Sequence, residues 1–301
     1  MKAERGASFN CRGKVSHKLV IVLLFAVLIV LWYWLGSSLL YVGEPNPPES
    51  VASKAAIIDG IYSTSPNDRF IKEAVDCFGE MNFTTDLYLG ENVTINLLMN
   101  LPSKYRIVVL RLHSAVHTDH FIYLFSAELY NEKDYLLEQI EGAVKKAFTF
   151  TDEGPYFALR GDLLSYKKPE SLKGSLVILM GCNGTNDPVF MNKLIEQGAA
   201  AYVGWTGYVD LRHTDSATLF LLKKLCVDNL DLGEAVKATM KEVGPDPVYG
   251  SALHYFPKEK SGFKLEQAIL FNSNRILHVL TEPSRIAKEK PPHIRLQIEG
   301  L

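Results

Sequence analysis

The chain has 301 residues, of which 47% are hydrophobic and 22% are charged, and its formal net charge at pH 7 is -2. This composition excludes a largely disordered chain, and no excess of positive charge is available for a nucleic-acid partner. The length suits one globular domain of about 200 to 250 residues together with an accessory segment.

The N-terminal region has the pattern of a membrane anchor. Residues 19–43 contain no charged side chain and begin with the apolar run LVIVLLFAVLIVLWYWL, long enough as a helix to cross about 30 Å of hydrocarbon. Positive charges dominate residues 1–18 and should stay on the cytoplasmic side. We expect a cytoplasmic N-terminus, one transmembrane helix in the lipid bilayer, and the rest of the chain outside. A cleaved signal peptide is the alternative, but the run exceeds a usual signal core and no A-x-A site follows.

A globular domain is expected over 52–257, after a proline-rich linker at 44–51 and before a C-terminal extension at 258–301. Short apolar runs predict buried strands in the domain at 55–62, 85–90, 105–113, 175–182 and 199–205. Helical patterns lie between and after these strands, at 68–79, at 95–99 before Pro102, at 188–198, at 214–225 and at 231–243. The alternation of strands and helices predicts an α/β fold, a three-layer sandwich with a mostly parallel sheet, preceded by the transmembrane helix.

Two parts of the chain have less regular patterns. Between the third and fourth strands, we expect a strand or hairpin at 121–130 and a helix at 131–148. In the C-terminal extension, residues 293–300 alternate apolar and polar side chains, which predicts an edge strand.

His113 and Cys182 each follow a buried strand, and ligands of open parallel sheets bind beyond the carboxyl ends of the strands. If the two strands are neighbours, both side chains face one crevice. An imidazole that accepts the proton of a thiol is the usual way to activate cysteine as a nucleophile. The alternative is that Cys182 is a small apolar residue at the end of a strand and that His113 satisfies a buried acceptor.

The order of these motifs resembles the caspase-like fold shared by caspases, gingipains, separase and CHAT domains. The resemblance covers 52–257 and rests on VVLRLHSA around His113, VILMGCNG around Cys182, and the later blocks MNKLIEQGAAAYVGWTGYVD and LDLGEAVKATM. It implies that His113 is the acid or base, that Cys182 is the acylated nucleophile, and that the backbone amides of Ser114 and Cys182 bind the oxyanion. Such families usually have glycine after the histidine, whereas this chain has Ser114.

Further candidate residues have weaker signals. Asp187 and Trp205 are candidates for binding substrate, although Asp187 also suits a helix cap and Trp205 also suits the core. The stretch HSAVHTDH brings His117, Asp119 and His120 close in sequence, but its spacing matches no strong metal pattern, so we expect no metal. Walker-type, GxGxxG, HExxH and CxxC patterns are missing, and no cofactor is expected.

Three cysteines, Cys77, Cys182 and Cys226, follow the expected anchor. Either Cys77 pairs with Cys226 and leaves Cys182 free, or Cys77 and Cys226 are buried thiols. The function that the sequence predicts is a membrane-anchored cysteine peptidase, a hydrolase whose substrate is a polypeptide. The alternative is a binding or sensing module that keeps the fold without the reaction, and a metal hydrolase is a third possibility.

Overall fold

The structure is a computed structural model that describes residues 26, 31–32, 54–102, 105–149, 154–168 and 170–265. The chain divides into two compact units, Met1–Ser50 and Val51–Leu301. Within the described residues, no helix is both long and apolar enough to cross a bilayer. The expected transmembrane helix at 19–43 lies outside these residues except at Ala26, Leu31 and Trp32, and the expected strand at 293–300 lies wholly outside them.

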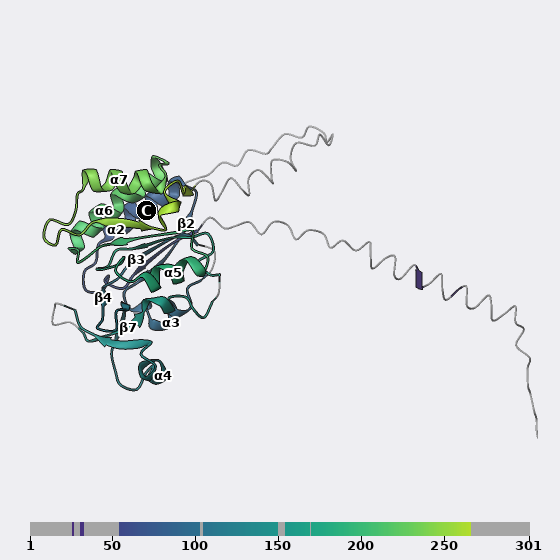
Figure 1. Ribbon diagram of the computed structural model, residues 1–301, viewed down its shortest axis with the longest axis vertical. Helices are drawn as coiled ribbons and strands as arrows, with labels where there is room; N and C mark the ends of the chain where they lie inside the picture. Colours follow the sequence, from purple (N-terminus) through teal and green to yellow (C-terminus); the bar gives the residue numbers. More distant parts are fainter. Residues whose placement is uncertain are drawn as a thin grey trace, which may run out of the picture. The chain divides into compact units, whose positions relative to one another are not determined.

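A six-stranded sheet forms the centre of the second unit (Figure 1). Its strands in spatial order are β10 (Leu253–Phe256), β9 (Ala201–Trp205), β8 (Leu176–Leu179), β3 (Tyr105–Arg111), β1 (Lys54–Asp59) and β2 (Thr84–Leu89). All neighbouring pairs are parallel except β10 with β9. The five strands predicted in the domain are therefore confirmed, and so is the mostly parallel arrangement of an α/β fold.

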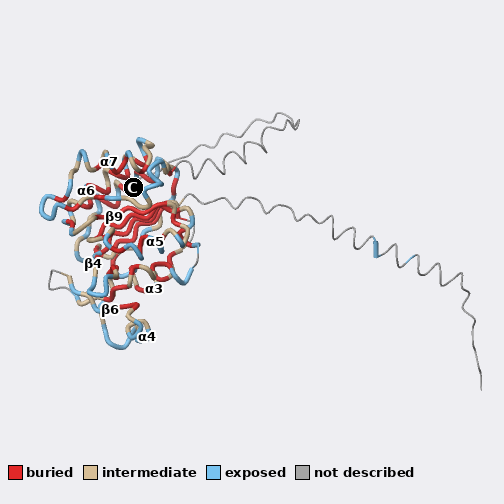
Figure 2. The backbone as a smooth tube through the Cα atoms, viewed as in Figure 1, coloured by how far each residue is buried: buried red, intermediate tan, exposed pale blue. Residues whose placement is uncertain are grey.

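Helices cover both faces of this sheet, as expected for a three-layer arrangement. One face packs against α2 (Asp68–Glu80), α6 (Leu211–Leu222) and α7 (Leu232–Glu242), and the other against α3 (Ile95–Met99) and α5 (Pro188–Glu196). Successive residues of β1 alternate between the two cores, with Ile57 in the first and Ile58 in the second, and both are fully buried. The sheet is therefore the most deeply buried layer (Figure 2).

A second, antiparallel sheet lies between β3 and β8 in the sequence. Its strands in spatial order are β4 (Ser114–Val116), β5 (Ile122–Leu129), β7 (Tyr156–Arg160) and β6 (Val144–Ala147). The helix predicted at 131–148 is wrong, because only α4 (Leu136–Ile140) is helical there. Gly142 has a positive φ of 69°, which ends the helix, and Val144 then buries its side chain as β6 pairs with β7.

One further difference from the sequence predictions lies at the edge of the central sheet, and the structure also decides between the two alternatives for the cysteines. β10 was not predicted, and it adds to β9 with Leu253 opposite Trp205. Cys77 and Cys226 are free and buried, which corresponds to the second of the two alternatives for this pair. Burial raises the pKa of both thiols, to about 12 for Cys226.

Asp187 begins helix α5 and is almost completely buried. Its Oδ1 accepts hydrogen bonds from the amides of Val189 and Phe190, and its Oδ2 accepts one from the amide of Ile122 at 2.9 Å. The cap predicted from the sequence is confirmed. The bond from Ile122 ties the start of α5 to the start of β5. The Asp187 carboxylate therefore links a helix that covers the central sheet to the second sheet.

Replacing Asp187 with alanine should lower the free energy of unfolding by about 2 to 4 kcal/mol, because the cap is lost and the buried Ile122 amide loses its acceptor. Urea unfolding followed by circular dichroism measures the change. Asp231→Ala is a matched control, since Asp231 caps α7 through the single amide of Glu234 and should cost only about 1 kcal/mol. Equal losses for the two variants would contradict the linking role.

Candidate active site

The register of β3 and β8 brings His113 and Cys182 to the same edge of the central sheet. These strands are parallel neighbours with Leu110 opposite Leu179, and each candidate residue lies three positions beyond that pair. Both residues line one cavity of about 400 Å³, which we call the Cys182 cavity. The structure therefore brings together the two side chains that the sequence singled out, at the carboxyl edge where ligands of such sheets bind.

The Cys182 thiol is half-buried and faces the segment that follows β9. Its Sγ lies 3.8 Å from the carbonyl oxygen of Val209, a long and weak hydrogen bond. Among the described residues, no hydrogen bond joins this thiol to the His113 ring. Both groups therefore line one cavity, and the described residues show no hydrogen bond between them.

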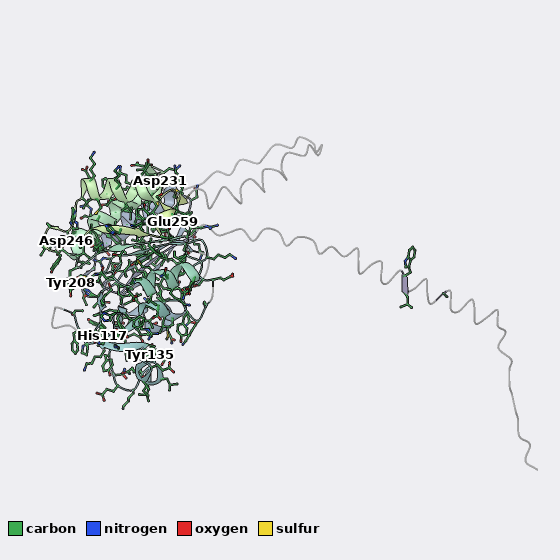
Figure 3. All side chains as sticks on the ribbon, in the orientation of Figure 1. His117, Tyr135, Tyr208, Asp231, Asp246 and Glu259 are labelled. Carbon is green, nitrogen blue, oxygen red and sulfur yellow. The ribbon has the colours of Figure 1, made fainter. Side chains whose placement is uncertain are left out.

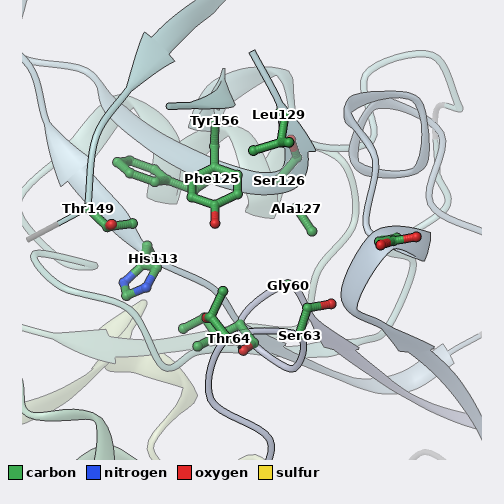
Figure 4. Close-up of a pocket in the computed structure, with 12 residues that line it drawn as sticks. Gly60, Ser63, Thr64, His113, Phe125, Ser126, Ala127, Leu129, Thr149 and Tyr156 are labelled. Atoms are coloured by element: carbon green, nitrogen blue, oxygen red, sulfur yellow. Dashed lines mark hydrogen bonds between the residues drawn. The ribbon is translucent and has the colours of Figure 1, made fainter. Parts of the chain in front are cut away.

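His113 borders two cavities rather than one. Besides the Cys182 cavity, it lines a smaller cavity of about 190 Å³ together with Thr64, Ser126 and Tyr156 (Figure 4). Its ring packs edge-on against Phe125, with the ring centroids 6.1 Å apart. The imidazole is exposed and therefore accessible to a ligand in either cavity.

The surroundings shift the pKa values of both groups toward their neutral forms. The protein around His113 lowers the pKa of its ring by desolvation, and the positive charge of Arg111 lowers it further. Burial raises the pKa of the Cys182 thiol, and the negative charge of Asp246 contributes in the same direction. At neutral pH the pair is therefore a thiol beside a neutral imidazole, which is able to accept a proton, rather than a preformed ion pair.

Two backbone amides beside these side chains have no partner among the described residues. On either side of β4, the carbonyl of His113 accepts a hydrogen bond from the amide of Phe125, and the amide of His117 donates one to the carbonyl of Phe121. Hydrogen-bonded positions alternate along an antiparallel pair, so residues 113, 115 and 117 face β5 with their backbone groups and residue 114 does not. The Ser114 amide therefore points away from β5. Within the described chain, the Cys182 amide also makes no hydrogen bond. Both residues line the Cys182 cavity, as an oxyanion site requires.

Ser114, at the position where the resemblance predicts glycine, has a structural function. Ser114 Oγ donates a 2.7 Å hydrogen bond to the carbonyl oxygen of Cys182, which fixes β4 against the turn that carries the thiol. Gly181 allows this approach, because a Cβ there would lie 2.5 Å from the carbonyl oxygen of Leu112. The Ser114 hydroxyl is thus bound to the Cys182 carbonyl, whereas the Ser114 amide remains able to donate to a ligand.

The two other candidates are not brought to the cavity wall. Asp187 is occupied by three amides, as described above, and does not line the cavity. Trp205 is completely buried, and its Nε1 donates a 2.9 Å hydrogen bond to Oγ1 of Thr214. Thr214 does line the cavity and in turn donates to the carbonyl of Met180. Trp205 therefore acts on the cavity only by holding Thr214.

The histidine-rich stretch after His113 forms an ion-paired surface cluster. Asp119 Oδ2 lies 2.7 Å from Nζ of Lys145 and 3.1 Å from Nδ1 of His117. The pKa of Asp119 is well below its ordinary value because the bonds from Lys145, Phe121 and Tyr123 outweigh desolvation. Within the described residues, no three potential ligands gather closely enough to hold a metal ion.

A buried ion network beneath the site was missed by the sequence reasoning. The Arg111 guanidinium lies between two buried carboxylates, 2.9 Å from Asp59 Oδ2 and 2.8 Å from Asp215 Oδ1. Arg111 ends β3, two residues before His113, and a charged residue at the end of an otherwise apolar strand was the available signal. The network ties the ends of β1 and β3 to α6 and so fixes the base of the loop that carries His113.

No protein-family model matches this chain, and no curated protein matches it either. The fold and the site define an α/β protein in which a thiol and an imidazole line one cavity at the carboxyl edge of a mostly parallel sheet. Ser114 and Cys182, whose amides have no partner in the described part of the chain, line the same cavity.

Proposed function

We propose that this protein is a membrane-anchored cysteine peptidase of caspase-like fold, which hydrolyses peptide bonds through an acyl-enzyme on Cys182. The observation that carries the proposal is the equivalent register position of His113 and Cys182 on neighbouring strands, with both lining one cavity. The apolar run at 19–43 supports the anchor, with the catalytic domain outside the membrane.

The reaction follows from the groups at the cavity. A peptide carbonyl enters with its oxygen toward the amides of Ser114 and Cys182, and the thiol turns about its Cα–Cβ bond from Val209 toward the substrate. His113 accepts the thiol proton as sulfur attacks the carbonyl carbon, and the protonated ring then donates that proton to the leaving amine. Water hydrolyses the thioester, with His113 accepting a proton from it, and the free thiol is restored.

A binding or sensing module without the reaction is the second candidate function. It is favoured by the raised pKa of the Cys182 thiol, because burial and the negative charge of Asp246 keep the sulfur in its unreactive, protonated form. The two candidates differ in turnover. A module of this kind binds peptides in the Cys182 cavity but releases them uncut.

Hydrolysis of a peptide panel by the full-length chain in detergent separates the two functions. The panel varies the residue before the scissile bond, and amine release and peptide binding are both measured. We expect the protein to cleave at least one peptide of the panel with multiple turnovers. Peptide binding with no product from any member would support the module and refute the peptidase.

The pH profile of hydrolysis should be set by His113 on its acid side. Because the pKa of His113 is lowered, the imidazole is neutral and basic at pH values below its ordinary 6.5, so kcat/KM should reach half its maximum below that pH. Alkylation of Cys182 by iodoacetamide in the absence of substrate should instead keep rising above pH 9.0, since burial raises the thiol pKa. Coinciding profiles would indicate a preformed ion pair and contradict this arrangement.

A further inference from the structure

The Cys182 cavity contains a single carboxylate. Of the described residues that line it, Asp210 is the only Asp or Glu, and none is Lys or Arg. Asp210 is exposed, follows β9 and comes directly after Val209, whose carbonyl oxygen lies 3.8 Å from the Cys182 sulfur. Among the described lining residues, a ligand therefore meets the negative charge of Asp210 and no lysine or arginine.

Asp210 is held in place while one of its oxygens remains available. It caps helix α6, where its Oδ1 accepts from the amides of Arg212 and His213 at 2.9 and 3.2 Å. Its own amide donates a 2.7 Å hydrogen bond to Asp246 Oδ2. Within the described residues, Oδ2 of Asp210 has no hydrogen bond or ion pair. The carboxylate is thus oriented by the backbone and still able to accept from a ligand.

A second carboxylate behind Asp210 strengthens the negative potential. Asp246 is buried, and although burial raises its pKa, bonds from the amides of Asp210, Tyr249 and Val248 lower it overall. It is therefore charged, and its field reaches Cys182, whose pKa it helps to raise. Two negative charges act on this side of the cavity.

Aromatic rings stand beside the two carboxylates. Tyr208 and Tyr249 both line the cavity and are exposed, and their ring centroids are 5.8 Å apart. Tyr208 lies on the same side of the molecule as Asp246 (Figure 3). Exposed Phe148 lines the cavity as well. Aromatic faces attract cations and exclude water from the alkyl part of a long side chain.

We propose that Asp210 is a specificity-determining residue that selects substrates with lysine or arginine at the position next to the reacting carbonyl. This inference rests on the proposed peptidase function and deepens it by naming the substrate class. The cationic head pairs with Oδ2 of Asp210, and the stem lies against Tyr208 and Tyr249. An acidic side chain at this position is repelled by Asp210 and Asp246.

Covalent labelling of the full-length chain tests this selection. Three peptide acyloxymethyl ketones are compared, identical except for arginine, its neutral isostere citrulline, or glutamate beside the reactive carbonyl. The rate of adduct formation on Cys182 is followed by intact mass. We expect the arginine probe to react about tenfold to a hundredfold faster than the citrulline probe, as one charge-assisted hydrogen bond supports, and the glutamate probe to react slowest.

Asp210→Asn should remove the arginine preference while keeping the helix cap, because asparagine caps as well as aspartate. Asp231→Asn is the matched control, since it changes the capping carboxylate of α7, and it should keep the preference. Labelling of Cys182 at equal rates by all probes would overturn the selection and leave the nucleophile intact. A preference that persists in Asp210→Asn would overturn the role of Asp210. No labelling of Cys182 by any probe would overturn the peptidase itself.

Discussion

Replacing Cys182 with alanine should lower kcat/KM for peptide hydrolysis at least about a thousandfold, and His113→Ala should do the same. Without the sulfur no acyl-enzyme forms, and without the imidazole the reaction loses the general base that takes the thiol proton and returns it to the leaving amine. Because the two residues act as a unit, the double variant should lose no more than either single variant. Steady-state hydrolysis of the best peptide of the panel measures all three.

Two further substitutions test whether losing any cysteine or any histidine lowers the rate of hydrolysis. Cys77→Ala removes a buried thiol from α2, and His117→Ala removes an exposed imidazole from the surface cluster after β4. Neither residue lines the Cys182 cavity, so both variants should keep the hydrolytic rate. Hydrolysis that survives in Cys182→Ala or His113→Ala would show that another group performs the chemistry.

Replacing Arg111 with methionine should lower the free energy of unfolding by roughly 3 to 5 kcal/mol, because two buried carboxylates lose their common partner. Burial already raises the pKa of Asp59 to about 6, against the lowering effect of Arg111. In the variant, that carboxyl group takes up a proton more readily. The loss of stability should therefore be smaller at pH 5 than at pH 8. Urea unfolding at the two pH values measures both effects.

The matched control for Arg111 is Arg69→Met. Arg69 also pairs with a carboxylate, 2.7 Å from Glu73 Oε1, but its side chain is 87% exposed whereas that of Arg111 is 1% exposed. Solvent screens such a pair, so stability should change little. Similar losses for the two variants would contradict the structural role of the buried network. A triple variant that also converts Asp59 and Asp215 to asparagine should recover much of the loss, because no uncompensated charge remains.

The central sheet and its helix caps could be predicted from the sequence because their signals are local. Ile107, Val108 and Val109 are apolar in succession, as expected for a strand covered on both faces, and β3 is buried in this way. Asp187 precedes a proline at the first helical position, and it caps α5. The common edge of His113 and Cys182 follows from the order of strands once β3 and β8 are neighbours.

Of the second sheet, only β5 was predicted, as the strand at 121–130, because the stability of the other strands comes from pairing between distant segments. The sequence Val144–Ala147 has no strong strand pattern, and it becomes a strand only because β7 supplies the partner. Asp210 was not singled out either, because the sequence predicted the helix only from 214, whereas α6 begins at Leu211 with Asp210 as its cap. Its place on the cavity depends on how the segment after β9 crosses the ends of β3 and β8. The Ser114 bond to Cys182 likewise joins residues 68 positions apart.

The proposed peptidase reaction requires a thioester on Cys182, and capture of this intermediate tests the reaction most directly. The full-length chain is mixed with a peptide ester, quenched in acid during turnover, and analysed by mass after proteolysis. We expect one acyl group on the fragment that carries Cys182, removable by hydroxylamine and missing from Cys182→Ala. Steady turnover with the acyl group on another residue, or with Cys182 unmodified throughout, would contradict it.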